Sequence, residues 1–314
     1  MGYTLNNIYP VLAMIEDPSP PAYEPVSLND DDARSLPGDA PLEADEAARP
    51  GSGHHAAITS SLRAIHRTLR GISGWVSYFR GLGAWAAMFA GTMFLYGLLT
   101  AARVPSLVAG PISAVALLPL YTAWLHVVIS APSPRPFWRR LPPFARTFRA
   151  AAAPVLLYFL ALELSSFVPG QVGRAVGLPQ WSAAQPGTVP EGSAADVWKA
   201  LLVFALAAAL KVFLVVPAHV VLTRVQASLL PEEDETIVPF DRSFRGKLEP
   251  AVVGGSGYVS VRDAWATFDR ASWVRLVKLL AKLFAVGFVV GAAWMAVVIP
   301  ELLIILRYAK KVEA

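Results

Sequence analysis

The sequence predicts an all-α protein, a polytopic bundle of transmembrane helices preceded by a disordered N-terminal tail. Three observations lead to this prediction. Of the 314 residues, 55% are hydrophobic and only 16% are charged, whereas a soluble domain carries about 25% charged residues. The apolar residues form long blocks separated by polar loops, and residues 1–58 are acidic and rich in proline. A lipid bilayer is therefore the expected solvent of most of the chain.

Composition also excludes several classes of site and partner. The chain has no cysteine, which removes disulfides, thiolate nucleophiles and cysteine metal sites. The net charge of +4 combines an acidic tail with basic loops beside the apolar blocks, a distribution typical of membrane orientation. No nucleic-acid-binding motif accompanies the basic residues. We therefore expect no nucleic-acid partner, no cofactor and no metal site.

Residues 1–58 are assigned to the disordered tail because this acidic stretch has too little apolar surface to form a core. Its one apolar patch, Ile8 to Ile15, is too short to span a membrane and lacks the flanks of a signal peptide, so a cleaved leader is not expected. Within the tail, Pro20, Pro21 and Tyr23 fit the Pro-Pro-x-Tyr pattern that WW domains bind. A WW-domain partner and a chance match in a proline-rich tail both remain open.

The rest of the chain divides into a surface helix and a transmembrane domain. Residues 59–80 predict an amphipathic helix along the membrane surface, with leucines and isoleucines opposite arginines. The transmembrane domain covers 81–307, with spans of near or above 20 residues at about 81–102, 106–130, 150–168, 198–223 and 280–306. The last two spans flank a large polar loop, 225–275, and residues 308–314 form a C-terminal tail.

The basic residues of the short loops predict the orientation. Five arginines and no acidic residue lie between 131 and 149, whereas Arg174 is the single basic side chain between 169 and 197. The first loop should therefore face the positive-inside compartment and the second the opposite side. Five spans place the basic C-terminus on that opposite side, which fits the rule poorly. Four or six spans are therefore kept as alternatives.

Two pairs of matching segments indicate an internal repeat. Residues 126–130, His-Val-Val-Ile-Ser, match residues 219–223, His-Val-Val-Leu-Thr. Downstream of each, residues 143–149 match residues 239–245. Because order and approximate spacing are kept, we expect a duplicated unit of span, polar loop and span, and such repeats are frequent in transporters.

The segment from Pro217 through Arg224 to Gln226 resembles the signature that ends the odd-numbered helices of mitochondrial carriers: proline, any residue, acid, two residues, base, any residue, base, any residue, glutamine. Residues 258–278 are similar to the matrix helix of that family and its exit, and residues 70–81 to the glycine-rich step into an even-numbered helix. The resemblance covers about 60–306. It implies three carrier-like units that lack only the first helix, and hence five spans.

The chain departs from the carrier pattern at the charged positions of the gate. His219 and Leu222 stand where carriers have an acid and a base, and His126 and Ile129 align there in the preceding unit. A charge-based gate needs oppositely charged pairs. The resemblance therefore implies a degenerate member, similar to the carrier-like proteins of the mitochondrial outer membrane that serve in fusion or protein insertion.

Ionisable residues inside spans are the candidate substrate or pathway residues, because burying them in lipid is costly. They are His126, Glu163, Lys211 and His219. Glu163 and Lys211 could pair across neighbouring helices or line a path for an anion or proton, although interfacial placement is the simpler explanation. The two histidines could share a ligand, but a structural hydrogen-bonding role is simpler.

Three functional hypotheses follow. The first is a carrier-like scaffold, insertion factor or small-molecule carrier, and the second is an endomembrane adaptor whose cytosolic tail recruits a WW-domain ubiquitin ligase. The third is a membrane-embedded enzyme, for which Glu163 with His126 is the one pair to nominate; their expected depths differ, so no catalytic residue and no enzyme activity are predicted. The acidic tail is the reverse of an arginine-rich transit peptide. It is therefore more compatible with the mitochondrial outer membrane or an endomembrane than with matrix targeting, and the carrier resemblance favours the outer membrane of these two.

Overall fold

A computed structural model describes residues 2–17, 57–179, 193–194, 196–249 and 254–312. These ranges are helical and contain no β-strand, only an isolated bridge between Ser130 and Thr236. The predicted all-α class is therefore confirmed. Residues 18–56, with the Pro-Pro-x-Tyr motif at Pro20, Pro21 and Tyr23, lie outside the described residues.

The long apolar helices confirm an integral membrane helix bundle. In the described ranges four helical segments are long and apolar enough to cross a bilayer, and a bent pair makes up to five. The first segment is α3 (Leu82–Ala101), preceded by α2 (Leu62–Ser73) and a 3-10 turn (Gly74–Phe79), and the second is α6 (Phe144–Ala175). The third is α7 (Asp196–Leu210), which continues through a π-helical turn (Lys211–Val215) into α8 (Val216–Ala227), and the fourth is α10 (Arg270–Val312). The bent pair is α4 (Ser106–Ala116) with α5 (Leu118–Ile129).

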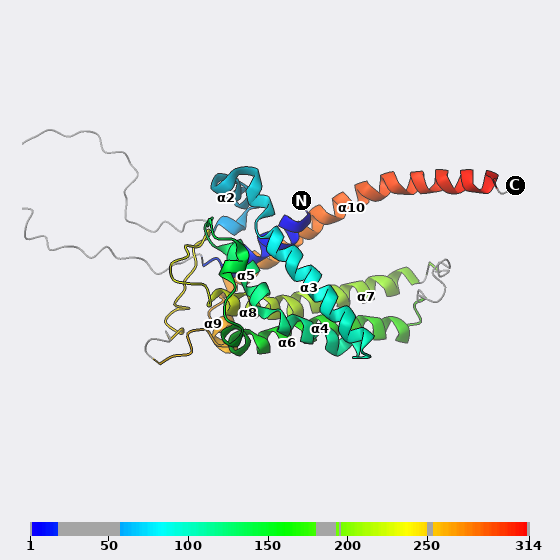
Figure 1. Cartoon of the computed structure of the whole chain (residues 1–314). Helices are drawn as coiled ribbons and strands as arrows, with labels where there is room; N and C mark the ends of the chain where they lie inside the picture. Colours follow the sequence, from blue (N-terminus) through cyan, green and yellow to red (C-terminus); the bar gives the residue numbers. More distant parts are fainter. Residues whose placement is uncertain (1, 18–56, 180–192, 195, 250–253, 313–314) are drawn as a thin grey trace, which may run out of the picture.

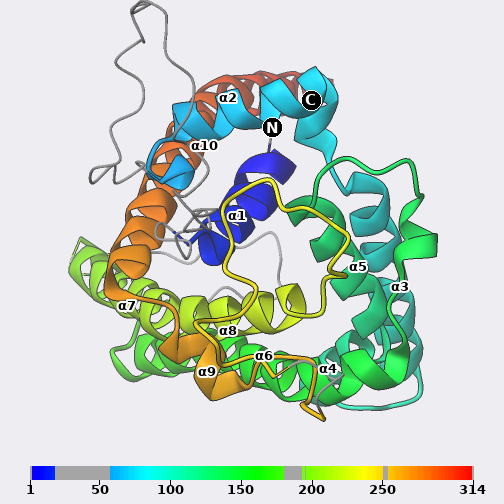
Figure 2. The same cartoon turned by 90° about the vertical axis from the view of Figure 1, so that its left-hand side faces the viewer.

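The spans form a ring, and the long polar segment after α8 lies at one end of it (Figure 1, Figure 2). Figure 1 shows α3, α4, α6 and α7 running alongside one another, while α10 diverges from them toward the C-terminus. The segment between α8 and the short helix α9 (Val261–Ala266) lies at the end where α2 and the N-terminus lie, called here the loop side. The turns after α3 and α6 lie at the opposite end, as does the C-terminus (Figure 1). In Figure 2 the helices surround α1 (Tyr9–Ile15).

Prolines explain the irregularities of two spans. The axis bends by 61° between α4 and α5, where Leu117 leaves helical geometry and Pro119 lies in the first turn of α5. A proline has no N–H, and its ring clashes with the carbonyl four residues before it. Pro217 likewise lies in the first turn of α8, directly after the π-helical turn. Such a turn lets the helix continue past a proline.

Gly81 sets the approach of α3 to α5. It precedes α3 with a φ of 72°, and a Cβ there would lie 3.2 Å from Val128 and 3.3 Å from Trp124. Glycine adopts this left-handed conformation without the steric cost of a side chain. The preceding residue, Arg80, donates from Nε to the carbonyl of Val127 at 2.8 Å. The entrance to α3 is thus fixed to the loop-side end of α5.

The assignment of all of residues 1–58 to a disordered tail is wrong for its first part. A π-helical turn (Thr4–Ile8) leads into α1, and Ile8, Leu12 and Ile15 are fully or almost fully buried. The acidic composition of the whole tail concealed an apolar stretch that is too short to cross a membrane but long enough to pack on protein. A short helix can gain most of its stability from such packing.

The amphipathic helix expected on the membrane surface is also covered in part by protein. Ile65 and Leu69 of α2 are buried in the same cluster as the apolar side chains of α1. Its arginines are exposed or partly exposed, as the helical periodicity predicts. The apolar face of α2 therefore helps to enclose α1 rather than facing lipid alone.

The topology can be tested by cysteine labelling, since the natural chain has no cysteine. In sealed vesicles, a membrane-impermeant maleimide should label Ser133→Cys and Ser256→Cys from one side. It should label Ala102→Cys, Ser193→Cys and Lys310→Cys from the other side, because an odd number of spans separates the two groups. Labelling of residues 256 and 310 from the same side would contradict five spans.

Candidate functional site

The candidate site is the centre of the ring on the loop side, where α1 packs against α5, α8 and α10. The hydroxyl of Tyr3 donates to the carbonyl of Arg80 at 2.8 Å and accepts from Nε1 of Trp124 at 3.0 Å. Burial raises the pKa of Tyr3 to about 12, against a smaller lowering by the Trp124 hydrogen bond. Tyr3 is therefore a neutral donor at physiological pH, and it ties the start of the chain to α3 and α5.

Arg224 of α8 is the buried hub of this site and is only 4% exposed. Its guanidinium donates to the carbonyls of Ala264 at 3.0 Å and Met14 at 3.4 Å, and to the hydroxyl of Thr267 at 3.0 Å. The rings of Phe244 and Phe268 lie 5.0 and 5.5 Å from its central carbon. Such cation–π contacts strengthen where water is excluded. One side chain thus joins α1, α8 and α9.

Glu16 anchors the end of α1. Its carboxylate accepts hydrogen bonds from the backbone N–H groups of Ile58 at 2.6 Å and Thr59 at 3.0 Å, and from the Thr59 hydroxyl. Arg275 of α10 lies 3.8 Å from the carboxylate and donates to the Glu16 carbonyl at 2.7 Å. The Glu16 side chain is 1% exposed. A carboxylate this deeply buried is stable only when it is paired and hydrogen-bonded.

Gln226 and His126 connect α8 to α5 in the same layer. Nε2 of Gln226 donates to the hydroxyl of Thr122 at 3.2 Å, and Nε2 of His126 lies 2.9 Å from the carbonyl oxygen of Gln226. All three side chains are buried. This arrangement matches the structural hydrogen-bonding role expected for His126. The His126 side chain is only 2% exposed, so it does not face solvent.

The other candidate residues lie apart from this centre. His219 is half-buried, and its ring lies 5.0 Å from that of Tyr158 on α6. Glu163 and Lys211 are exposed on α6 and on the π-helical turn, and no ion pair joins them among those of the described ranges. The structure therefore does not bring the four candidates together. Over the same ranges, no group of three or more histidine, aspartate or glutamate side chains is placed to hold a metal ion.

The matched segments of the expected repeat differ in conformation. Residues 143–149 begin α6, whereas residues 239–245 form turns in which Phe244 and Arg245 have positive φ values. The carboxylate of Asp241 holds those turns by accepting hydrogen bonds from Ser243 and from the N–H of Arg245 at 2.7 Å. Burial alone would raise the pKa of the Asp241 carboxyl. The hydrogen bonds from Ser243 and Arg245 together lower it by a larger amount, so the pKa lies below its ordinary value. The repeat stays a prediction.

Sequence reasoning did not identify Tyr3, Glu16 or Arg275 as site residues. A signal was present for Glu16, because it directly ends the apolar run from Ile8 to Ile15 and so marks the end of a short helix. No pattern in the sequence pairs it with Arg275, which lies 259 residues further along the chain. The motif residues Arg224 and Gln226 were identified, but their role here is to hold α1, α5 and α9 together.

Replacement of Glu16 tests the anchor. In Glu16→Gln the amide keeps one acceptor but places an N–H group against donors of Thr59, which leaves buried polar groups unsatisfied. We expect a loss of about 1–3 kcal/mol in the free energy that holds α1 in place. Hydrogen exchange of residues 2–17 should accelerate by roughly 5- to 150-fold, since 1.4 kcal/mol corresponds to about tenfold.

Glu233→Gln is the matched control, because the Glu233–Arg135 pair lies on the surface with 68% and 66% of the two side chains exposed. Exposed pairs contribute about 0–1 kcal/mol. Exchange in residues 2–17 should therefore be unchanged in this variant. Equal exchange rates for Glu16→Gln and the natural chain would show that the carboxylate does not hold α1.

Comparisons with family models, curated proteins and solved structures find no match to this chain.

Proposed function

We propose that this chain is a carrier-like membrane protein that acts as a scaffold or insertion platform and does not carry small molecules. The observation that carries the proposal is the position of α1, which fills the centre of the ring on the loop side with buried apolar side chains. A carrier needs that centre to open and close around its substrate. A ring whose centre is filled by its own N-terminal helix is suited to holding a fixed shape.

The fate of the carrier-like motif supports the same proposal. Leu222 is buried in an apolar cluster and His219 packs against Tyr158, so neither offers a charge for a gate. Arg224 is engaged with neutral carbonyl and hydroxyl oxygens and with aromatic rings. A switch between two states needs partners that differ between the states. Here the cation is used to dock α1 and α9 instead.

The proposed location is the mitochondrial outer membrane, and it rests on the carrier resemblance. Carrier-like proteins of that membrane serve in fusion or protein insertion, and loss of the gate charges is compatible with such roles. The polar segments after α5 and α8 contact each other and lie on one side of the bundle, together with residues 2–17 (Figure 1). That side carries the arginine-rich loop 131–149 and is therefore proposed to face the cytosol.

One observation favours the adaptor as a second candidate function. The backbone N–H of Asp17 donates to the carbonyl of Pro239 at 2.8 Å, which fixes the chain to the loop side three residues before Pro20. The last described residue before the motif of Pro20, Pro21 and Tyr23 therefore lies against the polar loop. The full chain should bind an isolated WW domain in detergent solution, and Tyr23→Ala should abolish binding because the aromatic anchor is lost. Unchanged binding by Tyr23→Ala would remove this candidate.

Reconstitution into liposomes tests the scaffold. The full chain should give only background uptake of labelled phosphate, dicarboxylates and nucleotides, and should increase insertion of a model protein with a single C-terminal span. Leu12→Asp, which places a charge in the buried face of α1, should release the helix without creating transport. Asn6→Asp is the control, since Asn6 is exposed on the preceding turn.

Two results would contradict the scaffold. Uptake of any of these solutes by the full chain would identify a carrier. Uptake by Leu12→Asp but not by Asn6→Asp would identify a carrier closed by α1.

A further inference from the structure

The outer face of α2 carries arginines and no acidic residue. Arg63, Arg67 and Arg70 recur at helical spacing and are exposed, whereas Ile65 and Leu69 are buried. Residues three and four apart lie on the same side of a helix, so the three guanidinium groups share one face. Because the apolar face of α2 packs on the cluster around α1, the arginine face is turned away from the bundle.

Two lysines of α10 extend this face. Lys278 and Lys282 are exposed and lie one helical turn apart. Nζ of Lys282 donates to the carbonyl of Ser60 at 3.1 Å, which places this part of α10 beside the residues that lead into α2 (Figure 2). We call these five cations the α2–α10 cationic surface: Arg63, Arg67, Arg70, Lys278 and Lys282.

The described residues supply no counter-charge for this surface. The ion pairs of the described ranges use other cations, namely Arg135, Arg140, Lys199, Arg245 and Arg275. Arg70 lies 5.4 Å from the centre of the Trp75 ring, which is a neutral partner. In the sequence, no acidic residue occurs between Glu46 and Glu163. The acids that lie closest to α2 along the chain are therefore those that precede it.

The preceding acids are concentrated in residues 30–46, which lie outside the described residues. This stretch holds seven acidic residues and one arginine. The described chain stops at Asp17 and resumes at Ala57, and the Glu16 carboxylate accepts from the N–H groups of Ile58 and Thr59. Both ends of the intervening stretch are thus held at one point, directly beside the start of the α2–α10 cationic surface.

The length of chain allows the acids to reach the whole of α2. Ile58 lies 12 positions after Glu46, and a connection of that length spans up to about 40 Å. Helix α2 has 12 residues and is therefore only about 18 Å long. A segment tethered this closely acts at an effective concentration in the millimolar range. Charge, position and reach therefore all match.

We propose that the α2–α10 cationic surface is a docking site for the acidic residues 30–46 of the same chain. Single exposed ion pairs are weak, but one tethered segment offers several of them at once. Docking would hold α2 against α1 through charge alone, so that salt or a competing anion releases it. The inference does not depend on whether the chain is a scaffold or a carrier.

Disulfide trapping in the full chain tests the contact, since the natural sequence has no cysteine. Ala44→Cys is combined with Gly71→Cys, because Gly71 is exposed on α2 and a Cβ there meets no atom within 4 Å. The matched pair combines Ala44→Cys with Ala145→Cys, beside the exposed Arg146 on the same side of the bundle. In neutral detergent at low salt, the first pair should oxidise about tenfold faster, which corresponds to about 1.4 kcal/mol.

Charge variants show whether electrostatics cause the difference. Replacing Arg63, Arg67 and Arg70 by glutamine should slow the first pair roughly tenfold, whereas replacing them by lysine should not. The same slowing is expected when Glu43, Asp45 and Glu46 are replaced by their amides, which leaves α2 untouched. As the matched control, replacing Arg139, Arg146 and Arg149 by glutamine should leave the first pair unchanged. Salt at about 1 M, where the Debye length is about 3 Å, should remove the excess.

Three results would overturn the proposal. Oxidation of the first pair that is no faster than that of the second would mean that the acids do not dock on α2. An excess that persists at high salt or in the glutamine variants would show that chain geometry, and not charge, brings the cysteines together. An excess that is kept in phosphatidylcholine liposomes but lost in phosphatidylglycerol liposomes would assign the arginine face to lipid headgroups instead.

Discussion

The structure depends on one buried cation. Arg224 lies inside the loop-side end of the bundle, where a guanidinium group is stable only if oxygen atoms and aromatic faces replace the water it has lost. Those replacements come from three separate parts of the chain: the carbonyl at the end of α1, the carbonyl and hydroxyl around α9, and the rings of Phe244 and Phe268. Removing any one of them leaves a charge partly unsatisfied. The position of α1 and the course of the polar loop are therefore linked through a single side chain.

The spans could be predicted from the sequence because their signal is local. A block of about 20 apolar residues has few alternatives to crossing a bilayer, and α3, α6, α7 with α8, and α10 all contain such a block. The bend between α4 and α5 was less visible, although Pro119 marks it, because a proline within a span is compatible with either a kink or a continuous helix.

The candidate site was predictable only in part because its members come from distant parts of the chain. Arg224 and Gln226 attract attention as polar residues at the end of a span. Glu16 does not, because it is one acidic residue in an acidic tail, and its burial depends on Thr59 and Arg275 far along the chain. Glu163 and Lys211 lie inside apolar blocks, which by sequence allows either a polar path or the simpler interfacial placement. In the structure both side chains are exposed on the helices that carry them.

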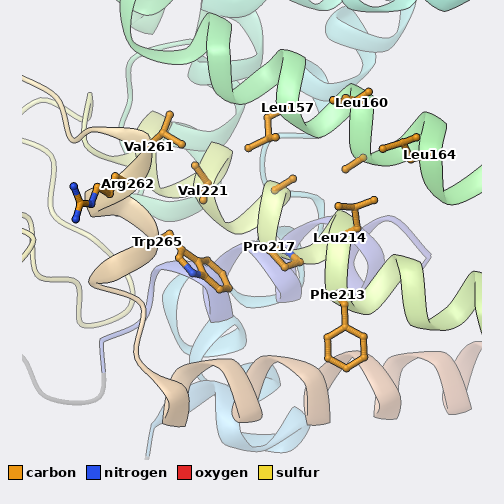
Figure 3. Close-up of a pocket in the computed structure, with 12 residues that line it drawn as sticks. Leu157, Leu160, Leu164, Phe213, Leu214, Pro217, Val221, Val261, Arg262 and Trp265 are labelled. Carbon is orange, nitrogen blue, oxygen red and sulfur yellow. The ribbon is translucent and has the colours of Figure 1, made fainter.

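Helix α8 carries the buried face that holds the loop-side end of the bundle together, and a hollow beside α6 adjoins that face. Val220, Arg224 and Ala227 recur at helical spacing and are buried toward α1, α5 and α9. Pro217 and Val221 lie on the neighbouring part of the helix surface, where both line a hollow beside α6 (Figure 3). Because the π-helical turn directly precedes α8, it sets the rotation of the helix and so the direction in which Arg224 meets its partners on α1 and α9. A change that removed the turn would rotate both faces together.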